Sequence, residues 1–223
     1  MKISDLKKRL ITSLFLVFLL YLSFNYVYIL IISLILISVI SWIEFRGLIL
    51  KIFNKKNFKF SLIKITLLAI GLLYLILFSS TVFVGISQDE LKYITLFLIS
   101  ICVFSDIGGL LFGKTFKGRK LTKISPNKTI SGSIGSFILS LVAVPIFYFL
   151  LSLRLKDIFY MIMLTILVSF FCQLGDLLIS FLKRKAKVKD TGNILPGHGG
   201  VLDRLDGIFF GLPLGFVTLI LIF

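Results

Sequence analysis

Long apolar runs constrain this chain more than any other feature of its sequence. The runs show neither the 3.6-residue period of an amphipathic helix nor the alternation of a half-buried strand. About 20 apolar residues cross the hydrocarbon layer of a bilayer as one helix, and a backbone in that layer must satisfy its own hydrogen bonds. Because 58% of the residues are hydrophobic and only 16% are charged, the sequence excludes a soluble core. It predicts an all-α, polytopic transmembrane helical bundle.

The breaks between the apolar runs predict about seven spans, within a range of about six to eight. The predicted spans are residues 10–24, 26–45, 61–80, 91–113, 132–152, 158–182 and 205–223. Only Ser23 and Asn25 interrupt the first two runs, so residues 10–45 suit either a tight helical hairpin or one long tilted helix. The basic start lacks a cleavage-site pattern, so we expect the first helix to remain as an anchor. No internal repeat divides the chain, and we expect a single membrane domain over residues 1–223.

Positive charge gives the predicted orientation. Most of the 25 Lys and Arg residues fall in the N-terminal tail and in those connections that seven spans place on the same side, which is typical of the cytoplasmic side. The N-terminus is therefore predicted to be cytoplasmic and the C-terminus outside. The net charge of +15 is explained by this topology and by attraction to anionic membrane lipids. We therefore expect no nucleic-acid partner.

Apart from Asp206 at the start of the last predicted span, three of the ten acidic residues, Glu44, Asp106 and Asp176, fall inside predicted spans. A carboxylate at a helix centre costs about 2.5–3.5 kcal/mol on insertion scales, so each should face a cavity, a partner or a metal ion. Asp176 shares one helix face with Gln173, Ser180 and Lys183, because the spacings are those of helical neighbours.

Asp203 and Asp206 are three residues apart at the start of the last predicted span. A helix N-terminal cap is the ordinary explanation for such acids. Two neighbouring carboxylates repel each other unless a cation or Arg204 intervenes. With Asp176 predicted near the same boundary, the three aspartates suit Mg²⁺ shared with substrate phosphates.

Two loops on the predicted cytoplasmic side have the composition of phosphate-binding segments. The first runs from Lys183 to Gly200, where glycines let backbone N–H groups approach an anion closely. It includes His198, the only histidine, for which a structural role is the more common explanation. The second follows Asp106 and contains Ser125, Lys128 and Thr129.

Small residues in the apolar runs have simpler explanations. Gly109 and Gly113 form a GxxxG pattern, which serves helix packing within the chain or between two copies, so a homodimer stays open. Cys102 and Cys172 are expected to be small core side chains rather than a disulfide or a metal pair.

The downstream loop resembles the signature of the phosphatidate cytidylyltransferase (CDP-diacylglycerol synthase) family. The matching residues are Ser180-x-Leu182-Lys183-Arg184, Lys189-Asp190-x-Gly192 and Leu195-Pro196-x-His198-Gly199-Gly200-Val201-x-Asp203-Arg204-Leu205-Asp206. The upstream segment is similar to the same family at Asp106, Gly109, Gly113-Lys114, Ser125-Pro126, Lys128-Thr129 and Gly132, and more weakly at Trp42-x-Glu44. The chain is shorter than many bacterial members, and Ile107 stands where a small or hydroxyl residue is usual.

The resemblance implies transfer of a cytidylyl group from CTP to phosphatidic acid, giving CDP-diacylglycerol and pyrophosphate. Residues 100–207 would form the catalytic segment, between N-terminal spans in 1–99 and a last span in 205–223. The implied catalytic residues are Asp176, Asp203, Asp206, Lys183 and Arg184, with the three aspartates binding Mg²⁺ and a second cation of open identity. The implied substrate-binding residues are Asp106, Ser125, Lys128, Thr129, Ser180, Lys189, Asp190, His198, Gly199, Gly200 and Arg204.

Three other functions compete with this interpretation. A CTP-dependent lipid-alcohol kinase would release CDP and a lipid phosphate. A CDP-alcohol phosphatidyltransferase is disfavoured because no Ala-Arg pair follows Asp203-Arg204-Leu205-Asp206-Gly207. A transporter is disfavoured because the acids gather toward one side of the predicted membrane. The resemblance and the uncleaved start place the protein in a bacterial inner membrane, with the active site facing the cytoplasm.

Overall fold

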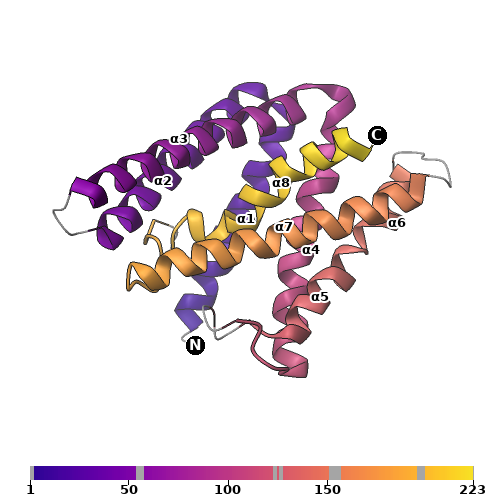
Figure 1. Ribbon diagram of the computed structural model, residues 1–223. Coiled ribbons are helices and arrows are strands. Elements are labelled where there is room, and N and C mark those ends of the chain that lie inside the picture. Colours follow the sequence, from indigo (N-terminus) through magenta and orange to yellow (C-terminus); the bar gives the residue numbers. More distant parts are fainter. Residues whose placement is uncertain are drawn as a thin grey trace. The chain divides into compact units, whose positions relative to one another are not determined.

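A computed structural model describes residues 3–53, 58–122, 125, 128–150, 157–194 and 199–222 of the chain. Within these ranges the regular elements are helices, and isolated bridge residues are found at Gly199 and in the antiparallel pair Lys120 and Thr129. The predicted all-α class is therefore confirmed. The helices, labelled in Figure 1, are α1 (Ile3–Asn25), α2 (Val27–Ile52), α3 (Phe58–Ser87), α4 (Asp89–Phe116), α5 (Ile130–Ser140), α6 (Ala143–Leu150), α7 (Asp157–Lys185) and α8 (Leu202–Ile222).

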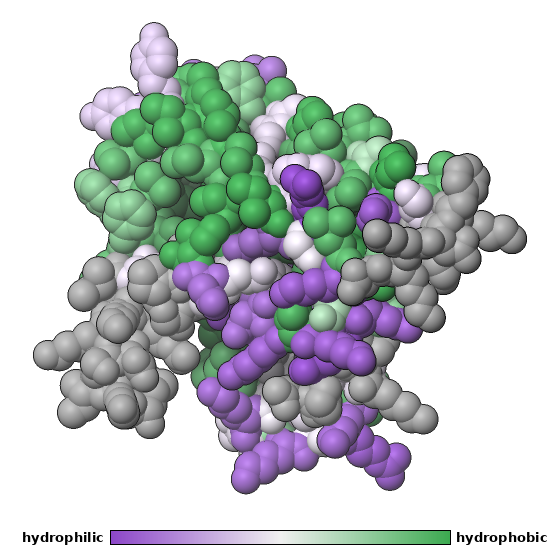
Figure 2. Space-filling model, turned by 90° about the vertical axis from the view of Figure 1, so that its left-hand side faces the viewer, coloured by the Kyte–Doolittle hydropathy of each residue, from purple (hydrophilic) through white to green (hydrophobic). Residues whose placement is uncertain are grey.

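Six segments in the described part of the chain are long and apolar enough to cross a membrane, and the protein is an integral membrane protein. They are Val27–Ile52, Ser61–Ser87, Asp89–Phe116, Ile130–Leu150, Asp157–Lys185 and Leu202–Leu221. The apolar part of α1, Leu14–Asn25, is shorter than the other six. Figure 2 shows apolar side chains over large parts of one face, with hydrophilic side chains gathered separately, as expected of a surface in contact with lipid.

The first two helices form a hairpin, which decides between the two alternatives for residues 10–45. Tyr26 alone separates them and adopts an extended conformation (φ −129°, ψ 110°). The Ser23 hydroxyl donates to the Ser33 hydroxyl at 3.4 Å. Ten residues of one straight helix would span about 15 Å, so the chain must fold back at Tyr26.

The fifth predicted span is broken into α5 and α6 by a turn at Leu141 and Val142. Pro145 follows in the first turn of α6 and has no N–H with which to bond the carbonyl four residues earlier. The Val144 N–H instead donates a hydrogen bond of 3.1 Å to the Leu141 carbonyl, which lies three residues earlier rather than four. Since a proline is tolerated in the first turn of a helix, the helix restarts here rather than continuing.

The chain forms two compact units. The first contains Met1–Ser87 and Leu182–Leu205, and the second contains Gln88–Phe181 and Asp206–Phe223. In the first unit α2 packs along α3, and the Ser38 and Ser79 hydroxyls meet at 2.6 Å between these helices. Each unit therefore combines segments that are far apart in the sequence.

The second unit is held by a close crossing of α4 and α5 and by a buried apolar core. A Cβ atom at Gly108 would overlap the carbonyl of Gly135, so these two glycines set the distance between the helices. The GxxxG residues Gly109 and Gly113 face Ser136 and Thr129 of the same chain. Cys102 and Cys172 are free, buried thiols with sulfur atoms 2.9 Å apart, which confirms their prediction as core side chains.

Candidate active site

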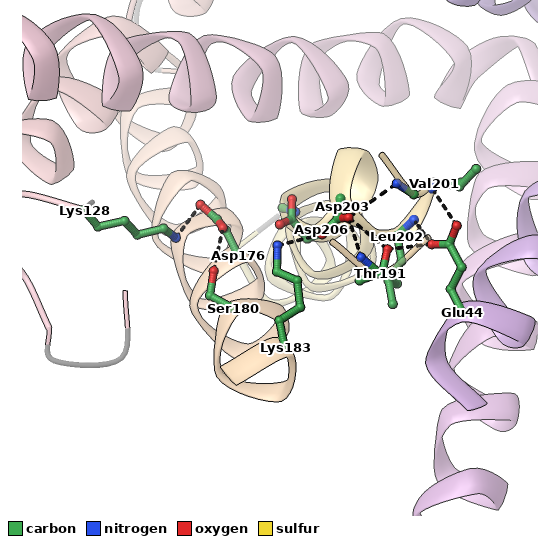
Figure 3. Close-up of polar contacts among 12 residues, drawn as sticks. Glu44, Lys128, Asp176, Ser180, Lys183, Thr191, Val201, Leu202, Asp203 and Asp206 are labelled. Atoms are coloured by element: carbon green, nitrogen blue, oxygen red, sulfur yellow. Dashed lines mark hydrogen bonds and ion pairs between the residues drawn. The ribbon is translucent and has the colours of Figure 1, made fainter. Parts of the chain in front are cut away.

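In the first unit, Asp203 is the centre of a dense polar cluster. Lys183 Nζ lies 2.6 Å from Asp203 Oδ1, and the Asp203 side chain is only 5% exposed. The other oxygen, Oδ2, accepts hydrogen bonds from the Thr191 backbone N–H at 2.7 Å and from the Thr191 hydroxyl at 3.0 Å (Figure 3). The Gly200 N–H adds a longer contact of 3.4 Å. Asp203 is thus held in one orientation from several directions.

Glu44 joins this cluster from α2, although the sequence alone did not identify it as a site residue. Its carboxylate is buried and accepts the Thr191 hydroxyl at 2.8 Å, the Val201 N–H at 3.1 Å and the Leu202 N–H at 2.9 Å. The signal available in the sequence was the cost of a carboxylate inside a predicted span. That cost indicates a polar partner without identifying it.

The loop between α7 and α8 is shaped around these two carboxylates. Gly199 has φ +84°, a left-handed conformation that favours glycine. A Cβ atom at Gly200 would overlap the Thr191 hydroxyl, and one at Gly192 would overlap the Glu44 carboxylate. The glycines at 192 and 200 therefore leave room for Glu44 and Thr191. Pro196, Gly197 and His198 lie outside the described residues, so the prediction for His198 rests on the sequence alone.

In the second unit, three aspartates from α4, α7 and α8 lie near one another. Asp176 of α7 forms an ion pair with Lys128 and accepts a long hydrogen bond of 3.5 Å from Ser180 (Figure 3). Asp206 of α8 is buried, and Asp176 and Asp106 lie within electrostatic reach of it. Asp106 was predicted to bind substrate. It belongs to the same cluster of carboxylates as Asp176 and Asp206.

The polar face predicted for α7 is also present in the second unit. Gln173 accepts a hydrogen bond from Ser133 of α5, one turn before Asp176. The Gln173, Asp176 and Ser180 side chains are all half-buried. The helix therefore carries its polar groups along one face within an otherwise apolar segment.

The second predicted phosphate loop has its own local structure. Thr129 caps α5, because its hydroxyl accepts the Gly132 N–H at 3.1 Å. Ser125 is buried, and its carbonyl accepts the Lys128 N–H at 3.1 Å. Pro126 and Asn127 lie outside the described residues. Of the three predicted binding residues here, Lys128 is the one that reaches a carboxylate.

The remaining predicted site residues are exposed. They lie at the end of α7, in the loop after it and in the first turn of α8: Arg184, Lys189, Asp190 and Arg204. Within the described ranges, no three or more His, Cys, Asp or Glu side chains are arranged as a metal site. Lysine ammonium groups, from Lys128 and Lys183, supply the positive charge beside Asp176 and Asp203.

Comparison with known proteins places these clusters in a family. The model of the Cytidylyltransferase family matches residues 1–222. The phosphatidate cytidylyltransferase of Staphylococcus haemolyticus (strain JCSC1435) is 40% identical over 169 residues, which are 75% of this chain and 61% of that protein. The phosphatidate cytidylyltransferase of Bacillus subtilis (strain 168) is 44% identical over 131 residues, 58% of this chain and 48% of that protein.

The matched relatives are longer than this chain. The phosphatidate cytidylyltransferase of Staphylococcus aureus (strain COL) is 37% identical over 169 residues, again 75% of this chain and 61% of that protein. The chain thus spans between 48% and 61% of the length of the relatives named here. Both polar clusters lie inside the residues that the family model matches. The chain belongs to the cytidylyltransferase family.

Proposed function

We propose that this protein transfers the cytidylyl group of CTP to phosphatidic acid, producing CDP-diacylglycerol and pyrophosphate for phospholipid synthesis. The observation that carries the proposal is the family match over residues 1–222. The relatives bear the name of this activity, and they support it although they are longer than this chain. A site of carboxylates and lysines at the ends of apolar helices suits a lipid phosphate and a nucleotide.

The proposed reaction is an in-line displacement at phosphorus. An oxygen of the phosphatidate phosphate forms a bond to the α-phosphorus of CTP, and the bond from that phosphorus to the bridging oxygen of the β-phosphate breaks. Pyrophosphate leaves with the electron pair. The phosphate nucleophile is already ionised near neutral pH, so the step needs no general base.

The chain must bring two anions together, and this is the task of its cationic residues. Lys183, Arg184, Lys189 and Arg204, with the Gly197–Gly200 turn, are proposed to hold the triphosphate and the leaving pyrophosphate. Ser125, Lys128 and Thr129 are proposed to hold the nucleotide or the phosphatidate head group. Since the Thr129 hydroxyl caps α5, its contribution is the shape of this loop as well as a contact. His198 is proposed as a substrate-binding residue.

The chemistry of these side chains suits Mg²⁺, which prefers carboxylate oxygens together with substrate phosphates, although the described side chains are not already gathered as a metal site. Asp206 is buried with Asp106 and Asp176 within electrostatic reach, and so large a local negative charge favours a cation. We propose Asp176, Asp203 and Asp206 as its ligands, with a second cation of open identity. When bound, the ion supplies positive charge that neutralises the phosphates.

The proposed setting is a bacterial cytoplasmic membrane, the inner membrane where there are two, with the active site facing the cytoplasm. Positive charge in the connections supports this orientation. The GxxxG pattern that left a homodimer open faces α5 of the same chain. A homodimer therefore stays a prediction without support from that pattern.

Labelled CTP tests the proposal. The purified protein is incubated with phosphatidic acid, Mg²⁺ and CTP labelled at either the α- or the γ-phosphate, and the lipid phase is extracted. The proposal predicts α-label in the lipid, dependent on phosphatidic acid and lost with a chelator, while the γ-label leaves as pyrophosphate. Label from the γ-phosphate in a lipid would instead show a CTP-dependent kinase, and no consumption of CTP would overturn both.

A further inference from the structure

Glu44 is a buried carboxylate that the proposed chemistry does not use. It lies in α2, more than 140 residues before the loop that it contacts, and it is 5% exposed. In the described part of the chain, its oxygens accept hydrogen bonds from the segment between α7 and α8 and from the start of α8: Thr191, Val201 and Leu202. A buried charge is costly unless it is hydrogen-bonded, and this segment provides the bonds.

Two of the three donors belong to the N-terminus of α8. The first N–H groups of a helix have no partner within the helix, and the positive end of the helix dipole favours an anion there. The Val201 N–H donates a hydrogen bond to Glu44 Oε1, and the Leu202 N–H donates one to Glu44 Oε2. Glu44 therefore acts as the cap of α8 from another helix. The first turn of α8, which carries Asp203, therefore depends on α2.

The third donor, the Thr191 hydroxyl, bridges Glu44 and Asp203. The Thr191 hydroxyl lies 2.8 Å from Glu44 Oε2 and 3.0 Å from Asp203 Oδ2. A hydroxyl has one proton to donate, so the two carboxylates compete for it. A change in the charge around Asp203 would therefore redirect the Thr191 proton toward Glu44 or away from it.

The glycines of the loop show that this contact is close-fitting. A Cβ atom at Gly192 or at Gly200 would overlap the Glu44 carboxylate. The loop backbone thus approaches Glu44 more closely than any residue with a side chain would permit.

Groups that support a ligating or catalytic carboxylate in this way usually contribute a factor of about 10–100 to activity.

We propose that Glu44 is a positioning residue, which orients Asp203 and the Gly199–Gly200 turn through Thr191 and the first turn of α8. The proposal rests on the proposed function, because it takes Asp203 as part of the reaction site. It extends that function to a residue in the N-terminal spans. Glu44 itself touches no substrate in this account.

The test compares Glu44→Gln with Ser41→Ala in the full-length protein. Ser41 is a suitable control because it lies one turn earlier in α2, is fully buried, and has no hydrogen-bond partner for its hydroxyl. We expect Glu44→Gln to lower kcat/KM for CTP about 10–100-fold, in protein that remains monodisperse. Ser41→Ala should stay close to wild type.

Thr191 provides a second route to the same conclusion. Thr191→Val removes the shared hydroxyl, whereas Thr191→Ser keeps it, so serine should restore most of the kcat/KM that valine loses. In the double variant Glu44→Gln/Thr191→Val, the losses should be less than additive, because both residues act through one contact. Full additivity, or wild-type kcat/KM in both single variants, would overturn the proposal. If Glu44→Gln is not recovered as folded protein, the comparison of Thr191→Val with Thr191→Ser still tests the proposal.

Limited trypsin digestion gives a readout that does not depend on activity. Lys187 and Lys189 are exposed in the loop that Glu44 holds, and Lys185 is exposed at the end of α7. Cleavage there should be several-fold faster in Glu44→Gln than in Ser41→Ala, without substrate. Equal rates would count against Glu44 as the anchor of the loop. A wild-type protein with no cytidylyl transfer would refute the proposed function instead, while the digestion would still test the anchor.

Discussion

At the residue scale, the two lysine–aspartate pairs differ in exposure and so should differ in their effect on stability. The Asp203 side chain is 5% exposed and that of Asp176 is 34% exposed. Removing one partner of a buried ion pair costs about 3–5 kcal/mol, whereas an exposed pair contributes about 0–1 kcal/mol.

We therefore expect Lys183→Met to lower the melting temperature in detergent clearly more than Lys128→Met does. The hydrogen bonds from Thr191 will recover part of the loss at Asp203, so the cost should lie below the full range for a buried pair. Thermal unfolding of the two purified variants measures the difference. Equal losses would mean that Asp203 does not depend on Lys183 for its charge.

The glycines of the loop give a second prediction at this scale. Gly200→Ala should reduce both stability and activity, because the new Cβ atom would overlap the Thr191 hydroxyl and the Glu44 carboxylate. Gly47→Ala in α2 is the matched control, since nothing lies within 4 Å of a Cβ atom there. Alanine in a helix interior is favoured over glycine by about 0.5–1 kcal/mol, so this control should be neutral or slightly stabilising. An unaffected Gly200→Ala variant would contradict the described loop.

At the scale of elements, the crossing of α4 and α5 depends on small residues. A Cβ atom at Gly135 would overlap Phe112 as well as approach the Gly108 carbonyl. Gly135→Ala should therefore destabilise the protein by about 1–3 kcal/mol, as overpacking does. Ile134→Ala is the control, because Ile134 is 53% exposed and lies beside Gly135 in α5. Thermal unfolding that ranks the control as the more damaged variant would show that the helices do not meet at Gly135.

The sequence predicted the elements well and their contacts less well. Apolar runs locate spans because the bilayer imposes their length, and each predicted span overlaps one helix or, at 132–152, two. The predicted bounds were too short, since helices extend beyond the apolar layer. The turn at Leu141 and Val142 was missed, although Pro145 was a local signal. The contact of Glu44 with Thr191 joins residues 147 apart, and no periodicity in either segment encodes it.

At the scale of the whole molecule, orientation is a prediction that labelling can test. Gln88 lies between α3 and α4 and Lys187 follows α7, and both are exposed. Seven spans with a cytoplasmic N-terminus put Gln88 outside and Lys187 inside. In intact cells, a membrane-impermeant maleimide should label Gln88→Cys and not Lys187→Cys, with the reverse in inverted vesicles. The native cysteines are buried and should not react with the maleimide in either preparation. The opposite pattern would reverse the orientation and the proposed side of the active site.

The sequence also indicated acidic residues that the structure places in polar clusters, but not how they are divided between the clusters. The free-energy cost of a carboxylate inside the membrane identified Glu44, Asp106 and Asp176 as candidates. Helical spacing paired Asp203 with Asp206. Local patterns could not tell that Asp203 is held by Lys183 and Thr191, whereas Asp206 interacts with Asp106 and Asp176. Those contacts arise from packing between segments. The roles of all these residues in catalysis stay predictions.

Cytidylyl transfer by this chain is expected to depend on its buried aspartates. The most direct test follows α-label from CTP into lipid with the wild type, Asp203→Asn, Asp206→Asn and Asp89→Asn, an exposed acid at the start of α4. All four must first elute as single, equally folded species. We expect label in lipid for the wild type and Asp89→Asn, and none above background for Asp203→Asn and Asp206→Asn. Wild-type incorporation by folded Asp203→Asn or Asp206→Asn would contradict this expectation.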